Sequence, residues 1–358
     1  MEISPYRLQK IRDFVFFVLT SAFMGGAFAC VMTYAATGTF SPDDARYMGL
    51  GVCAGLAIST GILLLDDLYV KKAVRPLWFS FTVVPLMQTA VIVGLYGTVF
   101  AAIVGVEYME KEAFLPQTLA FSLVLTAVLN FGSNVERLLG KHVLRGLVLG
   151  TYRVPKKENR FVMFLDLAGS TATAERLGDL EFHAFLNDFF SDIARPIVNF
   201  GGEIYKYVGD EAIVTWKEKA GAKNRAALAS FGAILEAIRK RSAYYERRYG
   251  LVPEFRAGLH FGPVIAGEMG LTRQEIAFSG DVMNTAARIQ AECRQLGERF
   301  LVSDDALALL CPKEPEGLAG RKGRAMPAGS APAVCEIVSR GAATLRGKTK
   351  EIGISAVR

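Results

Sequence analysis

Two aspartates, each placed where a predicted β-strand ends, are the residues of this sequence best suited to chemistry. Asp166 closes the apolar run 161–166 and is followed by a turn of small residues, 167–171. Such a turn can direct backbone N–H groups at phosphate oxygens, with a helix N-terminus behind it. Asp210 lies just past the bend of a predicted hairpin over 201–214. Carboxylates on neighbouring strand ends can hold Mg²⁺ ions, which complete their coordination with phosphate and water.

Each unit taken alone has an ordinary structural explanation, because an aspartate after an apolar strand is usually a turn residue or a helix cap. Both units occur in order, however, and a third polar segment follows at 280–288, which favours a functional site. In that segment Asn284 and Arg288 lie four residues apart and therefore on one face of a predicted helix. By itself, such a pair describes a solvated helix face.

Three segments together resemble the signature motifs of the class III adenylyl/guanylyl cyclases. Their sequences are FLDLAGST over 164–171, KYVGDE over 206–211 and GDVMNTAAR over 280–288. The similarity covers the chain from about residue 160 to the C-terminus and does not extend to its N-terminal third. It implies a ferredoxin-like catalytic core, β-α-β-β-α-β with extra C-terminal elements, and a lyase that cyclises a nucleoside triphosphate.

The resemblance assigns roles to the residues of the first two motifs. Asp166 and Asp210 would hold two Mg²⁺ or Mn²⁺ ions, with help from the backbone carbonyl of Leu167. One ion would lower the pKa of the ribose 3′-OH that attacks the α-phosphorus, and the other would hold the triphosphate. Phosphate oxygens would be bound by the N–H groups of Ala168, Gly169, Ser170 and Thr171. The hydroxyls of Ser170 and Thr171 more commonly cap the following helix.

Further polar side chains complete the site in the same resemblance. Asn284 and Arg288 would hold the ribose and neutralise charge that builds on the α-phosphate. Arg346 would bind the terminal phosphates, with Lys348 as the alternative, and Arg273 ranks below both.

Lys206, four residues before Asp210, has the spacing of the family's purine-selecting lysine. An ammonium group only donates, so it suits N1 of adenine, whereas N1 of guanine carries a hydrogen. In the family, this lysine is usually accompanied by an Asp, Thr or Ser that lies three residues before the first glycine of the third motif. This sequence has Ala277 there, which cannot bond to the exocyclic amine, and Glu275 or Ser279 could substitute. The sequence therefore favours ATP as the substrate, with GTP as the alternative.

The elements that must position these residues alternate between strand and helix patterns, which predicts an α+β fold with a largely antiparallel sheet. An aromatic stripe over 175–200 predicts a helix that packs on the core. Strands are predicted at 254–260 and 264–268, with a turn at Phe261-Gly262-Pro263 between them. The segment 312–332 is rich in Gly, Pro and Ala, which is typical of a loop.

Composition and hydropathy indicate a membrane domain before the cyclase motifs. The chain has 358 residues, of which 51% are apolar. Apolar stretches long enough to span a bilayer lie at 14–36, 47–65, 77–106 and 113–131. Lys and Arg precede the first, separate the second from the third and follow the fourth, which places both termini in the cytoplasm. A soluble helical domain is the alternative.

We therefore predict an α-helical transmembrane domain with four spans over 1–131, a helical linker over 132–157 and an α+β ferredoxin-like catalytic domain over 158–358. The location would be the inner (plasma) membrane, with a multi-pass anchor. Glycines such as Gly25 and Gly55 predict close packing of the spans. The linker helix would pair with its copy in a dimer or pack on its own domain.

The remaining composition excludes several classes of protein. The net charge of +6 is attributed to loops that face anionic lipid, because no basic segment interleaved with aromatics predicts a nucleic-acid groove. The five cysteines form no C-x-x-C pair and the three histidines are scattered, so neither a disulfide framework nor a zinc site is predicted. Charged residues are absent within the spans, which argues against ion transport.

The family builds its site between two domains, with the metal aspartates from one and the Lys, Asn and Arg from the other. One cyclase domain that carries both sets predicts a homodimer with two equivalent composite sites. The predicted protein is a membrane-anchored adenylyl cyclase that makes cyclic AMP from ATP. The alternatives are a guanylyl cyclase, or an inactive nucleotide-binding module regulated through its membrane domain. The sequence does not identify a ligand or partner of that domain.

Overall fold

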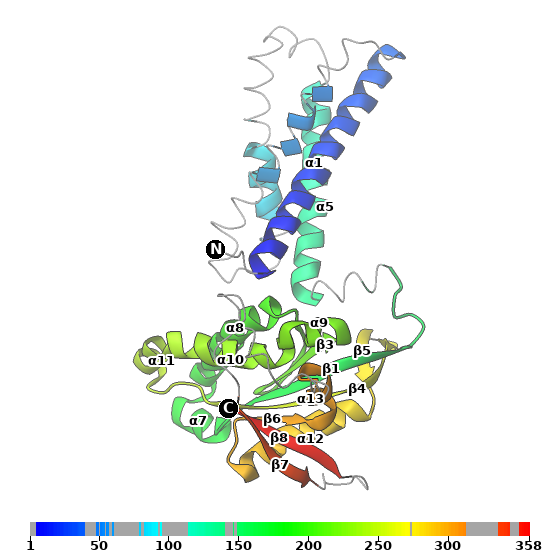
Figure 1. Ribbon diagram of the computed structural model, residues 1–358. Coiled ribbons are helices and arrows are strands. Elements are labelled where there is room, and N and C mark those ends of the chain that lie inside the picture. Colours follow the sequence, from blue (N-terminus) through cyan, green and yellow to red (C-terminus); the bar gives the residue numbers. More distant parts are fainter. Residues whose placement is uncertain are drawn as a thin grey trace, which may run out of the picture. The chain divides into compact units, whose positions relative to one another are not determined.

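The computed structural model of the chain forms two compact units, Gln9–Gly150 and Thr151–Arg358 together with Met1–Leu8, and each is treated separately below (Figure 1). The residues that the structure describes are 5–39, 48–49, 51–53, 55–56, 59–60, 79, 82–91, 94, 114–139, 146, 149–272, 274–312, 336–343 and 351–358.

The unit Thr151–Arg358 is built on one mixed β-sheet. Its strands are β1 Lys156–Leu167, β2 Glu203–Val208, β3 Glu211–Lys217, β4 Phe255–Met269, β5 Glu275–Ser279, β6 Phe300–Ser303, β7 Ile337–Ala343 and β8 Ile352–Val357. They pair in the order β2-β3-β1-β4-β6-β8-β7, and β5 pairs with β4. Strands β4 and β6 are parallel, whereas the other pairs are antiparallel.

The helices of this unit connect and cover the strands. They are α7 Ser170–Leu177, α8 Asp179–Asn199, α9 Glu218–Ala222, α10 Ala226–Lys240, α11 Ser242–Tyr249, α12 Asp281–Leu296 and α13 Asp304–Leu310, with a 3₁₀ turn at Lys223–Arg225. The helix predicted over 175–200 is divided at Gly178, whose φ of 75° favours glycine and ends α7.

Both faces of the central strand β1 are covered by helices. Phe161 and Met163 belong to the larger core cluster, together with buried residues of α8 and α10. Val162 and Phe164, which point the other way, pack with buried residues of α12. Because both faces of β1 are buried, residues 161–165 form a continuous apolar run instead of an alternating one.

The order of the first elements is that of a ferredoxin-like fold. The path β1, α8, β2, β3, α10, β4 gives the sheet order β2-β3-β1-β4, with a helix between β1 and β2 and another between β3 and β4. The predicted α+β ferredoxin-like core is therefore confirmed. The elements β5, α12, β6, α13, β7 and β8 follow it and extend the sheet on the β4 side.

The predicted turn at Phe261-Gly262-Pro263 is wrong, because β4 runs through it without interruption. In the observed register Arg160 lies opposite Gly262 and Asn159 lies opposite Pro263, so β1 pairs with β4 on both sides of this segment. Pairing with a long neighbouring strand overrides the local turn tendency of Gly-Pro.

Arg160 is a buried cation that joins three strands. Its side chain is 1% exposed and forms ion pairs with Glu158 at 2.9 Å and with Glu203 of β2 at 3.1 Å. It also donates to the hydroxyl of Tyr152 at 3.3 Å, and its guanidinium lies 4.5 Å from the centre of the Phe278 ring in β5. A charge this deeply buried is tolerated only with such partners, so Arg160 holds β1, β2 and β5 in one arrangement.

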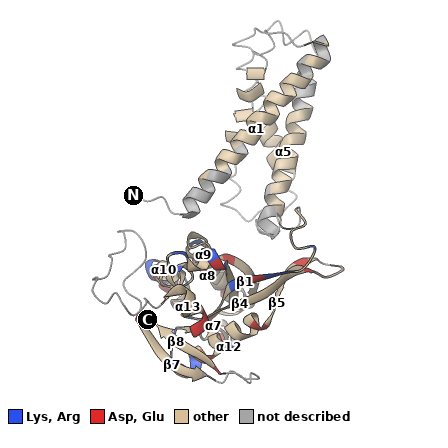
Figure 2. Ribbon diagram, turned by 45° about the vertical axis from the view of Figure 1, so that its right-hand side comes forward, with Lys and Arg blue, Asp and Glu red and all other residues tan. Residues whose placement is uncertain are grey.

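The unit Gln9–Gly150 contains helix α1 (Pro5–Thr37) from Gln9 onward and the whole of α5 (Phe114–Leu139), its longest described helices. Within α1, the segment Phe14–Val31 is long and apolar enough to cross a membrane, by length and composition. It is the one such helix among the described residues, and Thr82–Val91 and Ala120–Gly132 are shorter apolar stretches. Figure 2 shows the described turns of both helices without Lys, Arg, Asp or Glu over most of their length.

Four spans were predicted, and one helix among the described residues is long and apolar enough to be a span. Much of the second and third predicted spans lies outside the described residues. The predicted helical linker, 132–157, is described only in part. Helix α5 runs to Leu139 and β1 begins at Lys156, which pairs with Ala266 of β4, while 140–145 and 147–148 lie outside the described residues.

Glycine allows two segments of this unit to approach closely, as the sequence predicts. A Cβ on Gly25 would collide with the carbonyl oxygen of Gly51, and a Cβ on Gly55 would collide with that of Ser21. Backbones this close pack without intervening side chains, as is common between membrane helices.

Candidate active site

The β1–β3 pairing brings the two predicted metal aspartates together. Asp166 lies one residue before the end of β1, opposite Glu211 of β3 and Arg256 of β4. Asp210 occupies the tight turn between β2 and β3, after Gly209, whose φ of 61° favours glycine. Asp210 lies near enough for its negative charge to act on the carboxyl group of Asp166.

The electrostatic surroundings of Asp166 favour its neutral form. Burial, followed by the negative charge of Asp210, raises the pKa of Asp166 to about 6. The side-chain amide of Gln290 on α12 donates to Oδ2 of Asp166 at 3.3 Å and, together with the charge of Arg256, opposes that rise. Ionisation of a carboxyl group whose pKa is raised in this way costs free energy, and a bound cation would remove that cost.

Glu211 is a third carboxylate at this place, and sequence reasoning missed it. Burial, followed by the charges of Asp166 and Asp210, raises the pKa of Glu211 to about 7. The second motif contains Glu211 directly after Asp210, which could have indicated a further acidic ligand. Only the β1–β3 register shows that Glu211 lies opposite Asp166.

These residues fit a divalent ion of the Mg²⁺ or Mn²⁺ type. Asp166 and Asp210 offer oxygen, the donor that such hard cations prefer, and Gln290 and Arg256 compensate the charge repulsion at Asp166 only in part. Among the described residues, no three His, Cys, Asp or Glu side chains form a ready-made metal site. The contribution of the Leu167 carbonyl stays a prediction.

The small-residue turn differs from its predicted role in two respects. The N–H of Ala168 is already bonded to the carbonyl oxygen of Glu254 at 2.7 Å, so it is not free for phosphate. The N-cap of α7 is Gly169, and no side chain caps the helix, so the capping predicted for Ser170 and Thr171 is wrong. The first N–H groups of α7 therefore have no side-chain partner and remain suited to an anion.

The amide and the guanidinium of the third motif lie on α12. Asn284 is exposed and Arg288 is half-buried. Among the described residues, neither forms a hydrogen bond or ion pair with Asp166 or Asp210; the α12 residue that bonds to Asp166 is Gln290, which the motif comparison did not single out.

Lys206 has a partner in its own chain. Its Nζ lies 3.2 and 3.3 Å from the two carboxylate oxygens of Glu275 on β5. Ala277 lies on the same strand, opposite Gly267 of β4. The predicted phosphate-binding residues Arg346 and Lys348, and the lower-ranked Arg273, lie outside the described residues.

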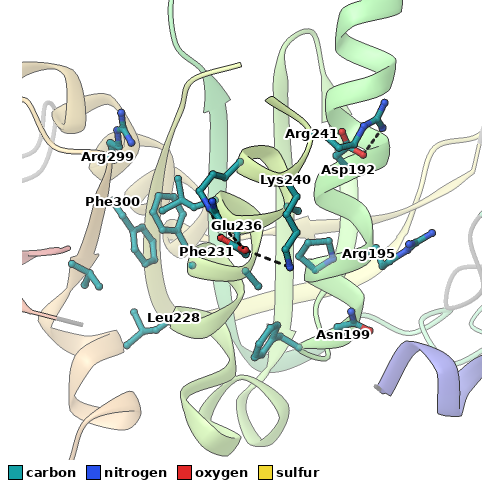
Figure 3. Close-up of a pocket in the computed structure, with 18 of the residues that line it drawn as sticks. Asp192, Arg195, Asn199, Leu228, Phe231, Glu236, Lys240, Arg241, Arg299 and Phe300 are labelled. Carbon is teal, nitrogen blue, oxygen red and sulfur yellow. Dashed lines mark hydrogen bonds and ion pairs between the residues drawn. The ribbon is translucent and has the colours of Figure 1, made fainter. Parts of the chain in front are cut away.

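A cavity of about 1700 Å³ occurs elsewhere in this unit, between α8, α10 and Phe300 (Figure 3). Two ion pairs at its edge, Arg241 with Asp192 at 2.7 Å and Lys240 with Glu236 at 3.4 Å, already satisfy charges there. None of the predicted site residues lines this cavity, so the carboxylate cluster, and not cavity size, locates the site.

The raised pKa of Asp166 predicts a specific dependence of stability on pH. Because the folded state favours the protonated carboxyl, it binds more protons than the unfolded state between pH values of about 4 and about 6. Ionisation of Asp166 therefore lowers the stability of the metal-free protein as pH rises through this window. Asp166→Asn removes the ionisation, so the Tm of the variant should exceed that of the wild type increasingly across the window.

Thermal unfolding at several pH values, with a chelator present, measures this difference. Asp179→Asn, at the exposed start of α8, serves as the control for the same change of side chain outside the carboxylate cluster. A Tm difference for Asp166→Asn that shrinks as pH rises would contradict the assigned electrostatics.

Comparison with known proteins gives one consistent family. Residues 153–327 match the family model described as "Adenylate and Guanylate cyclase catalytic domain". Adenylate cyclase 2 of Rhizobium meliloti (strain 1021) is 38% identical over 205 residues, which are 57% of this chain and 56% of that protein. An adenylate cyclase of Anabaena cylindrica is 28% identical over 156 residues, 42% of this chain and 31% of that protein. The chain thus spans about half or less of the length of these relatives.

A solved structure of a bacterial light-regulated adenylyl cyclase has the same fold. It aligns with a TM-score of 0.50 and 21% identity, over 65% of this chain and 64% of that one. Sequence motifs, sheet topology and relatives agree that residues 153–327 of this chain form a catalytic domain of the class III adenylyl/guanylyl cyclases.

Proposed function

We propose that this protein is an adenylyl cyclase that converts ATP to 3′,5′-cyclic AMP and pyrophosphate. The observation that carries the proposal is the pair Asp166 and Asp210, which the β1–β3 register brings together and whose negative charge is only partly compensated. The relatives named adenylate cyclase support the choice of reaction.

Asp166 and Asp210 are the residues that would hold two Mg²⁺ or Mn²⁺ ions. When bound, the ions would lower the pKa of the ribose 3′-OH and neutralise the triphosphate. The N–H groups at the start of α7, from Ser170 onward, would bind phosphate oxygens, since the N–H of Ala168 is already used. Arg346 and Lys348 would bind the terminal phosphates.

The acting assembly in this proposal is a homodimer. In a single chain, neither Asn284 nor Arg288 bonds to the aspartates, and both side chains have exposed surface for a substrate or a second chain. A two-fold dimer would place Asn284 and Arg288 of one chain at the aspartates of its partner. There they would orient the ribose and stabilise the charge that develops on the α-phosphate.

The base would lie against Lys206. Its ammonium group can donate to N1 of adenine but has nothing to accept from N1–H of guanine, which favours ATP over GTP. Guanylyl cyclase activity is the competing function, because Ala277 lacks the side chain that usually accompanies this lysine in the family.

We also propose that the N-terminal part anchors the enzyme in the plasma membrane with four spans and both termini in the cytoplasm, where ATP is present. The apolar segment Phe14–Val31, the close glycine packing around Gly25 and the distribution of Lys and Arg support this arrangement. A ligand or protein that acts on this domain would regulate the cyclase.

Product identification tests the proposed reaction. The purified protein should convert ATP to cyclic AMP in Mg²⁺ or Mn²⁺, with kcat/KM for ATP about tenfold or more above that for GTP. Chromatography with mass detection separates the two cyclic nucleotides. Cyclic GMP as the main product would establish the guanylyl cyclase alternative, and no product from either nucleotide would indicate an inactive binding module.

A further inference from the structure

Ala277 cannot bond to the exocyclic amine of the purine base, and Glu275 is positioned to do so in its place. Both carboxylate oxygens of Glu275 contact the ammonium group of Lys206, at 3.2 and 3.3 Å. The two side chains are 45% and 44% exposed, for Lys206 and Glu275 respectively. Exposed ion pairs contribute little to folding stability, so this pair is not needed to hold the strands together.

Strand geometry explains how the side chain of Glu275 can reach the base contact that position 277 usually makes. Side chains at alternate positions of a strand share one face, so Glu275, Ala277 and Ser279 project to the same side of β5. Ala277 carries only a methyl group, and the longer side chain of Glu275 places its carboxylate at Lys206. Ser279, on the same face, forms no hydrogen bond with Lys206 among the described contacts.

The backbone around this pair is held by aromatic contacts. The ring of Tyr205, next to Lys206, stacks on Phe278 with centres 4.6 Å apart and planes inclined by 28°. The backbone N–H of Phe278 donates to the hydroxyl of Tyr205 at 3.1 Å, and the guanidinium carbon of Arg160 lies over the Phe278 ring, 4.5 Å from its centre. Lys206 and Glu275 therefore project from a fixed pair of strands, β2 and β5, and stay side by side.

A donor beside an acceptor matches the edge of adenine. The ring nitrogen N1 accepts a hydrogen bond, and the neighbouring 6-amino group donates one. With Lys206 opposite N1, the carboxylate of Glu275 would face the 6-amino group. Guanine in the same position would set N1–H against the ammonium group and the O6 oxygen against the carboxylate, which are two repulsive contacts.

We propose that Glu275 is a specificity-determining residue that accepts a hydrogen bond from the 6-amino group of ATP while Lys206 donates to N1. This inference rests on the proposed adenylyl cyclase reaction and adds the residue that distinguishes the exocyclic group.

The test compares ATP with purine riboside 5′-triphosphate, which lacks only the 6-amino group, in wild type and Glu275→Ala. In the wild type, kcat/KM should be about tenfold or more higher for ATP, because a hydrogen bond to a charged group is lost with the analogue. In Glu275→Ala the two substrates should become nearly equal. Equal losses for both substrates in the variant would mean that Glu275 acts only on Lys206, and would overturn the proposal.

Two further variants sharpen the result. Glu275→Gln keeps an acceptor oxygen and should retain part of the preference for ATP, whereas Ser279→Ala should leave the preference unchanged. If Ser279→Ala removes the preference and Glu275→Ala does not, Ser279 is the acceptor and the proposal is wrong. Formation of cyclic AMP by the wild type is measured in the same assay, so a failure of the reaction itself is separated from a failure of the assignment to Glu275.

Discussion

Replacing Asp166 or Asp210 with alanine is expected to abolish the formation of cyclic AMP without unfolding the protein. The two carboxylates are the metal ligands that the chain would supply, and the one other carboxylate that the β1–β3 register sets opposite Asp166 is that of Glu211. Removing even an outer-shell partner of a metal typically costs ten- to a hundredfold, so the loss of a direct ligand should lower kcat by about a hundredfold or more. Initial rates at saturating ATP and Mn²⁺ measure the effect.

Two controls separate a lost ligand from a damaged fold. Mn²⁺ binding, followed by electron paramagnetic resonance, should weaken in both variants, and their Tm with a chelator present should not fall, since Asp166 bears unfavourable charge without a metal. Asp179→Ala, an exposed carboxylate at the start of α8, should keep both activity and metal binding. Activity above a few per cent in either variant would exclude that residue as an essential ligand.

Mixing two inactive variants is expected to restore activity if the composite site forms between two chains. Asp210→Ala removes the metal half of the site, and Asn284→Ala removes the half that acts on the ribose. In a mixed dimer one site carries both lesions and the other carries neither. Random exchange makes half of the dimers mixed, so the recovered activity should approach about one quarter of the wild-type value.

The matched control mixes Asp166→Ala with Asp210→Ala. Both lesions lie in the metal half, so each site of this mixed dimer keeps one of them and no recovery is expected. Chain exchange is verified by isolating dimers with two different tags. Absence of recovery in the first mixture, after such exchange, would show that Asn284 acts on the aspartates of its own chain.

The sequence by itself determined the α+β fold of the cyclase domain and indicated that Asp166 lies at a strand end. The run 161–165 is apolar because both faces of β1 are buried, and an aspartate at the end of such a run has to lie at an edge of the core. Helix α12 begins at Asp281, where the third motif predicts it, because Gly280 precedes it with a φ of 144°. These are local signals, which one segment carries without information about its neighbours.

Only the tertiary structure decided which side chains meet across the sheet. Glu211 and Gln290 reach Asp166 through the β1–β3 register and the packing of α12, and no spacing within one segment encodes either contact. Lys206 and Glu275 are 69 residues apart, and their contact depends on how β2 meets β5. The same reason explains the failed turn at 261–263, because the turn tendency of Gly-Pro is local, whereas the pairing of β4 with β1 is a property of the folded sheet.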